Sequence, residues 1–430
     1  MKAINIRRVF RHTLPILLMA VAMAFGLWQW QSARALEMDL KAVREKAYYS
    51  ALDGLISLET DLSKVLIAQS PGQQALLLSG IASLAAGVAE NLAALPPAYG
   101  GDADALKFLA QTADYAKTLA TAAAEGNMLS ETDVEQITLL QSKCAELRQH
   151  LENGVNFDYD ERVNAGEKMG IDYPSLMYDG PFSDGRRLGK ARGLTGGNVT
   201  AEEAVAIASA FLGNERVLSA QRAADAGGPV PTWGVALALA DVQITASVTQ
   251  QGGKMLWMAP ETAGFKVELD IEECILHAKA FLTSRGFGEV TDSFYQIYDG
   301  MAVINFAAVQ EEVVLYPDLV KVQVRMDTGA VIGLEANNYW MNHGPRERLH
   351  PQITKEEAAA RVTNRLSVKR VRLCVIPLKD GLGTGRTEAL CWEFDGMYEN
   401  NRYFVYIDAE TGDEVEVLKV VPASGGSLTM

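Results

Sequence analysis

The feature that most constrains this chain is a unit that occurs three times in its C-terminal half. Each copy starts with a helix-capping residue followed three positions later by glutamate: Thr200 and Glu203, Asp270 and Glu273, and Thr354 and Glu357. In the copies that start with Thr this is a capping box, in which the two residues satisfy each other's free backbone N–H groups. The adjacent glutamates (Glu202/Glu203, Glu272/Glu273, Glu356/Glu357) are therefore interpreted as stabilising the positive helix ends and not as acid/base catalysts.

Each cap is followed by an apolar stripe at helical spacing and then by strand-like segments that close on a glycine turn. The stripes are Ala204, Ala208 and Leu212; Cys274, Ala278 and Leu282; and Ala358, Val362 and Leu366. The turn glycines are Gly253, Gly329 and Gly412, which lie 53, 59 and 58 residues after their caps. This pattern predicts a helix followed by antiparallel strands. Units of about 70–80 residues are small for a core of their own, so neighbouring units should pack together.

The N-terminus carries a basic segment followed by Thr13–Ala33, which contains no charged residue. As a helix these residues would span about 31 Å, which matches a bilayer core of about 30 Å. We expect a single-pass anchor with a cytoplasmic N-terminus, because the basic residues precede the span, and we expect no second apolar span. The alternative is a signal peptide cleaved after Ala33-Arg34-Ala35.

Residues 34–155 are periodic in apolar residues at three- and four-residue steps, interrupted at Ser70-Pro71-Gly72, at Pro96-Pro97 and near Gly126. Four helices with short connections predict an antiparallel bundle, and the alternative is a loose helical stalk. Residues 156–198 lose all periodicity and are predicted to be a linker.

Composition excludes several functions. The formal net charge is −15 and the pI is about 4.9, so the chain should not bind nucleic acid. The residues show no nucleotide-binding or catalytic motif, and His277, His343 and His350 are scattered, so we predict no cofactor, no metal and no catalytic residue. Cys374 and Cys391 could face each other across a hairpin in an oxidising compartment, and Gly381, Gly383 and Gly385 between them suggest its loop.

The predicted fold class is α+β: an N-terminal transmembrane helix, an all-α region, then three tandem units of a helix plus an antiparallel sheet. The predicted boundaries are 1–33 for the anchor, 34–155 for the bundle, 156–198 for the linker, 199–263, 264–344 and 345–421 for the three units, and 422–430 for the tail.

Four motifs support a resemblance to a known family. They are Tyr173-Pro174-Ser175-Leu176 with Tyr178-Asp179-Gly180-Pro181-Phe182-Ser183-Asp184, Tyr316-Pro317-Asp318-Leu319-Val320-Lys321-Val322, the stretch from Glu335 to Asn342-His343, and Tyr406-Ile407-Asp408-Ala409-Glu410-Thr411-Gly412. The repeated unit resembles the PepSY domain, and the whole order is similar to a family of spore germination proteins with three PepSY units. The first unit departs most, because Gly252-Gly253 replaces the acid-Thr-Gly turn.

The resemblance implies a non-enzymatic protein of the inner spore membrane, with its bulk on the cortex side. It implies a SleB-like cortex-lytic peptidoglycan hydrolase as partner, which the protein would stabilise, localise and restrain, and it leaves peptidoglycan open as a further partner. The alternative function is a protease inhibitor or propeptide-like regulator at the cell envelope. Since aromatic residues dominate interaction hot spots, we expect partner binding at Tyr173, Tyr178, Phe182, Tyr316, Tyr339 and Trp340, each of which could instead pack within the sheet. We expect proteolysis at exposed glycine-rich segments near 154–198 and 222–231.

Overall fold

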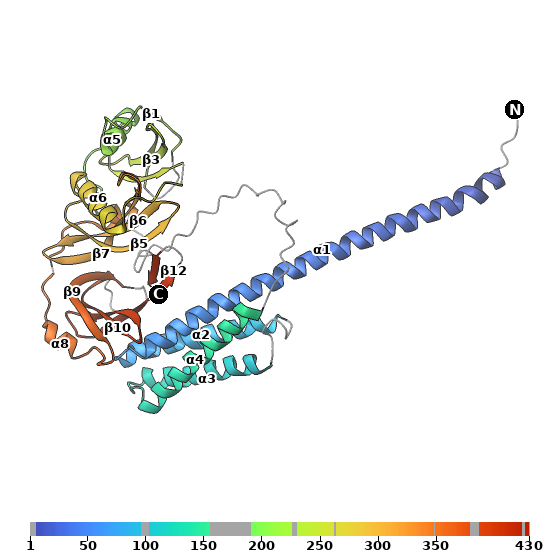
Figure 1. Cartoon of the computed structure of the whole chain (residues 1–430), viewed down its shortest axis with the longest axis horizontal. Helices are drawn as coiled ribbons and strands as arrows, with labels where there is room; N and C mark the ends of the chain where they lie inside the picture. Colours follow the sequence, from blue (N-terminus) through green and yellow to red (C-terminus); the bar gives the residue numbers. More distant parts are fainter. Residues whose placement is uncertain are drawn as a thin grey trace. The chain divides into compact units, whose positions relative to one another are not determined.

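The computed structural model describes residues 6–95, 103–154, 191–225, 230–261, 264–347, 349–378, 387–423 and 426–429 (Figure 1). These residues divide into a helical unit and a sheet unit, and the short segment Ile67–Gln74 belongs to the sheet unit. The predicted α+β class is confirmed. Most of the predicted linker, including its two aromatic motifs, and the glycine-rich loop around Gly383 lie outside the described residues.

The helical unit follows the pattern of breaks in the sequence. Its helices are α1 (Ile6–Val65), α2 (Pro71–Ala93), α3 (Ala103–Ala124) and α4 (Glu131–Gly154). Ser130 caps α4, since its hydroxyl accepts from the Asp133 N–H at 3.2 Å while the Asp133 carboxylate accepts from the Ser130 N–H at 2.9 Å. This reciprocal pair fixes the first turn of α4.

The helices pack through a buried apolar stripe. On α1 the stripe includes Ala51, Leu55 and Leu58, all fully buried. Tyr48 ties α1 to α4, because its hydroxyl donates to the Leu151 carbonyl at 2.7 Å. Gly54 lies so close to α2 that a Cβ at this position would overlap a methyl group of Val88. These contacts are those of a helical bundle and not of a loose stalk.

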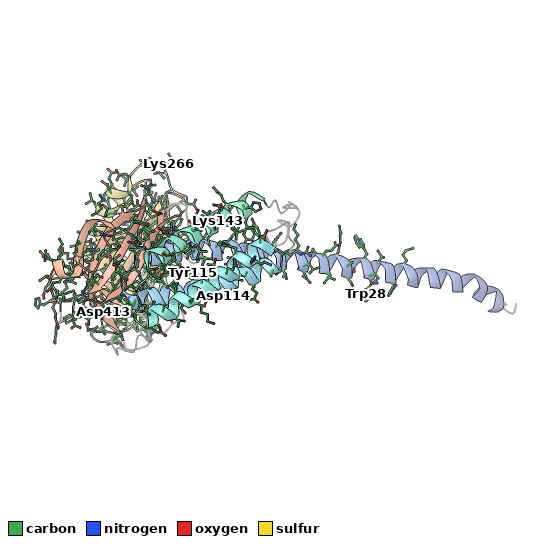
Figure 2. All side chains as sticks on the ribbon, turned by 90° about the horizontal axis from the view of Figure 1, so that it is seen from below. Trp28, Asp114, Tyr115, Lys143, Lys266 and Asp413 are labelled. Carbon is green, nitrogen blue, oxygen red and sulfur yellow. The ribbon has the colours of Figure 1, made fainter. Side chains whose placement is uncertain are left out.

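The predicted membrane anchor, Thr13–Ala33, lies within α1. Figure 2 shows Trp28 on the part of α1 that no other helix of the unit accompanies. Among the described residues, the helix that is long and apolar enough to span a membrane is α2, although 33% of its most apolar window is buried. The expectation of no second apolar span therefore missed α2. Length and composition do not distinguish a span from a bundle helix, and cleavage after Ala35 stays a prediction.

The sheet unit contains three consecutive groups of one helix and four strands. The first group is α5 (Ala201–Leu212), β1 (Ser219–Arg222), β2 (Thr232–Ala238), β3 (Gln243–Thr249) and β4 (Met255–Pro260). The second group is α6 (Ile271–Ser284), β5 (Val290–Tyr298), β6 (Met301–Gln310), β7 (Val313–Arg325) and β8 (Val331–Glu335). The third is α8 (Lys355–Ala359), β9 (Ser367–Pro377), β10 (Glu388–Tyr398), β11 (Asn401–Asp408) and β12 (Glu414–Ala423), and α7 (Asn337–Asn342) and β13 (Gly426–Thr429) lie outside the groups.

All described strands join one sheet of 13 strands, in the order β1-β2-β3-β4-β8-β7-β6-β5-β13-β12-β11-β10-β9. The first and second groups meet where β4 pairs antiparallel with β8. The second and third groups are linked through β13, which pairs with β5 on one side and β12 on the other, and directly where β7 pairs parallel with β9. One large core cluster is built mainly from the first two groups, and a smaller cluster lies between the second and third. The repeats therefore pack together, as their small size predicts.

Each helix is attached to its own hairpin by the same backbone contact. All three capping boxes are present, including the one that starts with Asp270. The residue before each cap donates its N–H to the carbonyl three residues before the turn glycine: Val199 to Gln250 at 2.8 Å, Leu269 to Met326 at 2.8 Å, and Ile353 to Ala409 at 3.0 Å. The same hydrogen bond recurs in all three copies and accompanies the nearly constant number of residues between cap and turn.

The third helix is shorter than the sequence predicts. The apolar stripe extends to Leu366, but α8 ends at Ala359. Val362, Thr363 and Asn364 have low helix propensity, and the Leu366 N–H donates to the Thr363 carbonyl in a turn. Leu366 is still buried, so it reaches the core from a turn and not from a helix.

Two glycines with positive φ allow the cost of backbone strain to be measured apart from the cost of a steric overlap. Gly300 has φ +71° and a Cβ there would overlap the Phe265 carbonyl, whereas Gly288 has φ +73° and open space around it. We expect Gly288→Ala to lower the free energy of unfolding by about 1–2 kcal/mol, from backbone strain alone. Gly300→Ala should cost more, because the backbone of residue 265 must also move. Urea unfolding of both variants checks this, and equal losses would contradict it.

Candidate functional site

The candidate functional site is built around an interruption in strand β7. Ala307 of β6 pairs with Leu319 and the next residue, Ala308, pairs with Leu315. Tyr316, Pro317 and Asp318 are therefore extra residues of β7 with no partner in β6. A proline has no N–H for a sheet ladder, which is why it is tolerated in such a bulge. The bulge directs two polar side chains toward the third group and its connection.

Tyr316 enters a buried network in the third group. Its hydroxyl donates to the Glu393 carboxylate at 2.5 Å, and the fully buried Glu393 also accepts from Arg372 Nε at 2.7 Å and from the Tyr406 hydroxyl at 3.2 Å. Burial, together with the nearby Glu393 charge, holds the pKa of Tyr316 well above its usual value. The network thus combines the buried Glu393 carboxylate, its arginine counter-charges and two neutral phenols.

Asp318 is fully buried on the other side of the bulge. Arg346 donates to both of its oxygens, at 2.7 and 3.0 Å, and His343 Nδ1 lies 2.9 Å from Oδ2. The same guanidinium contacts Glu388 of β10 at 3.1 and 3.2 Å. Burial opposes the charged form of Arg346, but the hydrogen bonds and negative charges of Asp318 and Glu388 together outweigh it and raise the pKa of the guanidinium. One arginine therefore links β7 to β10.

Helix α7 packs beside the bulge. Tyr339 stacks on the imidazole of His343 with 4.2 Å between ring centroids and donates its hydroxyl to the Phe287 carbonyl at 3.1 Å. Trp340 donates its indole N–H to the Met255 carbonyl at 2.8 Å. Asn342 donates its amide to the Pro317 carbonyl at 2.9 Å. The segment between the second and third groups thus contacts the bulge, the loop that follows α6, and strand β4.

The structure describes three of the six aromatic residues that are expected to bind a partner. Tyr316 and Tyr339 are only 4% and 2% exposed, because the bulge and the His343 stack cover them. Trp340 is half-buried. Tyr173, Tyr178 and Phe182 lie outside the described residues. Partner binding by these six residues stays a prediction, and for Tyr316 and Tyr339 it would require the junction to open.

The residues that hold the junction were not identified as a site from the sequence. Asp318, Arg346, Arg372 and Glu393 come from four different segments, and only folding brings them together. One signal was present, because Pro317 within a strand-like run indicates a bulge. Nothing in the sequence pairs Asp318 with Arg346, 28 residues later.

The chemistry of this cluster is that of an ion-paired junction. Asp318 and Glu393 have no exposed surface. Arg346 donates to both oxygens of Asp318, whereas Glu393 accepts from Arg372 at Oε1 and from two tyrosine hydroxyls at Oε2. In the part of the chain that the structure describes, no group of three His, Cys, Asp or Glu residues is arranged to hold a metal ion. Three of the glutamates considered as catalysts, Glu203, Glu273 and Glu357, act in the capping boxes.

Another buried carboxylate lies in the third hairpin, directly after its turn. Glu414 of β12 accepts hydrogen bonds from the backbone N–H groups of Gln69, at 3.0 Å, and Ser70, at 3.4 Å, both within the short segment that belongs to the sheet unit. Burial raises the pKa of Glu414 from 4.5 to about 7, and the two backbone donors only partly oppose this. Glu414 therefore titrates near neutral pH.

A capped helix followed by four antiparallel strands, three times over, defines a protein of PepSY repeats preceded by a helical region. Sequence profiles agree with this class. Residues 32–167 match "YpeB N-terminal", residues 160–349 match "YpeB sporulation, PepSY1 and PepSY2 domains", and residues 352–418 match "Peptidase propeptide and YPEB domain". The two YpeB profiles together cover well over half of the chain, and the chain belongs to the YpeB family of sporulation proteins.

Curated relatives carry the same family name. The sporulation protein YpeB of Halalkalibacterium halodurans is 34% identical over 176 residues, which cover 41% of this chain and 38% of that protein. YpeB of Oceanobacillus iheyensis is 27% identical over 231 residues, which cover 53% of this chain and 50% of that protein. The matched region thus spans half or less of these relatives' length. The solved Bacillus megaterium YpeB C-terminal domain aligns over 53% of this chain and 100% of its own, with 27% identity and a TM-score of 0.47.

Removing Arg346 should damage the junction. Arg346→Met leaves Asp318 buried without its main counter-charge, and we expect the free energy of unfolding to fall by about 3–5 kcal/mol. Arg402→Met is the matched control, since Arg402 is half exposed and its partner Asp395 keeps Arg370 at 3.2 Å, so its loss should be about 0–1 kcal/mol. Urea unfolding measures both. Similar losses would show that Arg346 does not hold the junction.

Glu414 should make stability depend on pH. Because its folded pKa is raised, its contribution is fully present below about pH 4.5 and is lost as the pH rises through 7. Glu414→Gln keeps an acceptor for Gln69 but carries no charge. We expect it to match the parent at pH 4 and to be more stable at pH 8, by up to about 3 kcal/mol. Thermal unfolding at both pH values checks this, with Glu416→Gln on the same strand as control. An equal effect at both pH values would contradict it.

Proposed function

We propose that this chain is a non-enzymatic sporulation protein that stabilises, localises and restrains a SleB-like cortex-lytic peptidoglycan hydrolase. The observation that carries the proposal is the match of residues 32–349 to YpeB sporulation profiles, on a fold of three PepSY repeats. The proposal places the chain in the inner spore membrane as a single-pass protein, with Thr13–Ala33 as anchor, a cytoplasmic N-terminus and the repeats on the cortex side.

The repeats suit binding because the sheet has a long strand at one end. Strand β9 pairs with β10 along its length, but it pairs with β7 only at Cys374 and Val375. Residues 367–373 therefore have a strand on one side only among the described strands, and an extended segment of the hydrolase could add there. Val368 is 40% exposed and would contact the added segment. Lys369 lies at a bulge between Arg370 and Val368, a feature that discourages indiscriminate strand pairing.

The second candidate function is a protease inhibitor or propeptide-like regulator. One observation favours it: residues 352–418 match a profile described as "Peptidase propeptide and YPEB domain". The two functions predict different partners. Crosslinking in intact spores followed by mass spectrometry separates them, because recovery of a protease without a cortex hydrolase would favour the second.

The first test is genetic. Spores that lack the gene should contain little or none of the hydrolase on an immunoblot, and complementation with the parent gene should restore it. Normal hydrolase levels in the deletion strain would defeat the proposal.

The second test addresses the β9 edge. We expect Val368→Asp to lower recovery of the hydrolase with the chain by about tenfold, because a charge at an interface anchor costs about 1–2 kcal/mol. Val267→Asp is the matched control, since Val267 is 65% exposed in the loop before α6 and should leave recovery unchanged. Equal recovery with both variants would exclude the β9 edge as the docking site.

A further inference from the structure

Two thiols face each other in the small core between the second and third groups. Cys374 of β9 and Cys391 of β10 are direct partners in the antiparallel register. Neither forms a disulfide in this structure, and both are fully buried. The Cys374 thiol donates to the Cys391 carbonyl, with 3.6 Å between sulfur and oxygen. The expectation from sequence that these residues could face each other is confirmed.

The register is compatible with a disulfide. Directly opposed residues of antiparallel strands place their side chains on the same face, with Cα atoms about 4.5–5.5 Å apart. A disulfide needs Cα atoms about 4.4–6.8 Å apart. The two strands therefore need not separate or slide for a bond to form between the two sulfur atoms.

We propose that Cys374 and Cys391 are an oxidation site, at which a cross-strand disulfide closes in an oxidising environment and ties β9 to β10 beside the junction of the second and third groups. The location supports this role. Cys374 is also the register partner of Val314 in β7, so it lies where β9 joins the second group. Both cysteines belong to the small core, together with Tyr316 from the β7 bulge.

The oxidant that the step requires is a low-molecular-weight disulfide. One cysteine thiolate attacks a sulfur of that disulfide, its S–S bond breaks, and one thiol leaves. The second cysteine then attacks the mixed disulfide, the S–S bond between Cys374 and Cys391 forms, and the other thiol leaves. Two protons and two electrons thus pass from the cysteine pair to the oxidant, which becomes two thiols.

Access limits the rate of this step in the folded chain. Burial, with the nearby Glu393 charge, raises the pKa of the Cys374 thiol, so little thiolate is present. The first attack therefore needs β9 to open. Strand β9 is the end strand of the sheet, paired with β10 along its length but with β7 at two residues only, so the side of β9 that faces β7 is the one placed to open locally. Once closed, the disulfide makes a loop between residues 17 apart in sequence and opposes further opening.

The other cysteines of the chain serve as internal controls for the oxidation experiment. These two residues, Cys144 on α4 and Cys274 on α6, are also buried and form no disulfide in this structure. Neither is a register partner of another cysteine in the described strands. The full chain, purified in detergent, is incubated with oxidised glutathione in dilute urea, and the remaining thiols are alkylated after denaturation and identified by mass spectrometry.

We expect loss of two of the four thiols and a linked peptide pair containing Cys374 and Cys391. Cys391→Ala should abolish the linkage, and Cys274→Ala should leave it intact. Oxidised parent should unfold at higher urea than reduced parent, with the folding equilibrium constant raised by up to about 100-fold, as for a loop of this length. Reductant should reverse the shift.

Three results would overturn the proposal. One is that all four thiols stay reactive, and the second is that glutathione remains attached to either cysteine without closure. The third is a linked form that unfolds at the same or lower urea than the reduced form. Circular dichroism of the reduced Cys391→Ala variant ensures that a lost linkage reflects the missing thiol and not an unfolded chain.

Discussion

Strand β7 is the element on which the rest of the sheet unit depends, because it pairs with three different strands. Its first residues pair with β6 and with β9, its last residues pair with β6 and β8, and the bulge at Tyr316–Asp318 separates the two parts. In a continuous strand, these three residues would be register partners of β6. The bulge allows one strand to belong to the second repeat and still reach the third.

The bulge has an electrostatic consequence. It places the Asp318 carboxylate where water does not reach, and a Tyr316 hydroxyl beside the equally buried Glu393. Buried charges of this kind are tolerated only with counter-charges and hydrogen bonds, which Arg346 and Arg372 supply. The junction between the repeats is thus specified by directional contacts as well as by apolar packing, and it fixes one arrangement of the second and third groups.

This architecture is suited to a protein that acts by binding. Three repeats share one sheet, and among the described strands β1 and the first half of β9 have a neighbouring strand on one side only. Cys374 and Cys391 lie in the small core at this junction. Glu414 belongs to the same third repeat. The cysteine pair and Glu414 thus lie in the same repeat as the β9 edge, to which the proposed function assigns partner binding.

The sequence by itself determined the local structure: the breaks between the four helices, the three capping boxes, the glycine turns and the order of the repeats. These depend on residues within a few positions of one another, so a periodic pattern is sufficient to predict them. The tertiary structure alone decided that the repeats share one sheet, that α8 ends at Ala359, that Tyr316 and Tyr339 are buried, and that Asp318 meets Arg346. Those outcomes depend on which distant segments pack together. The burial of a side chain is set by residues that are far away in sequence, so the local pattern does not predict it.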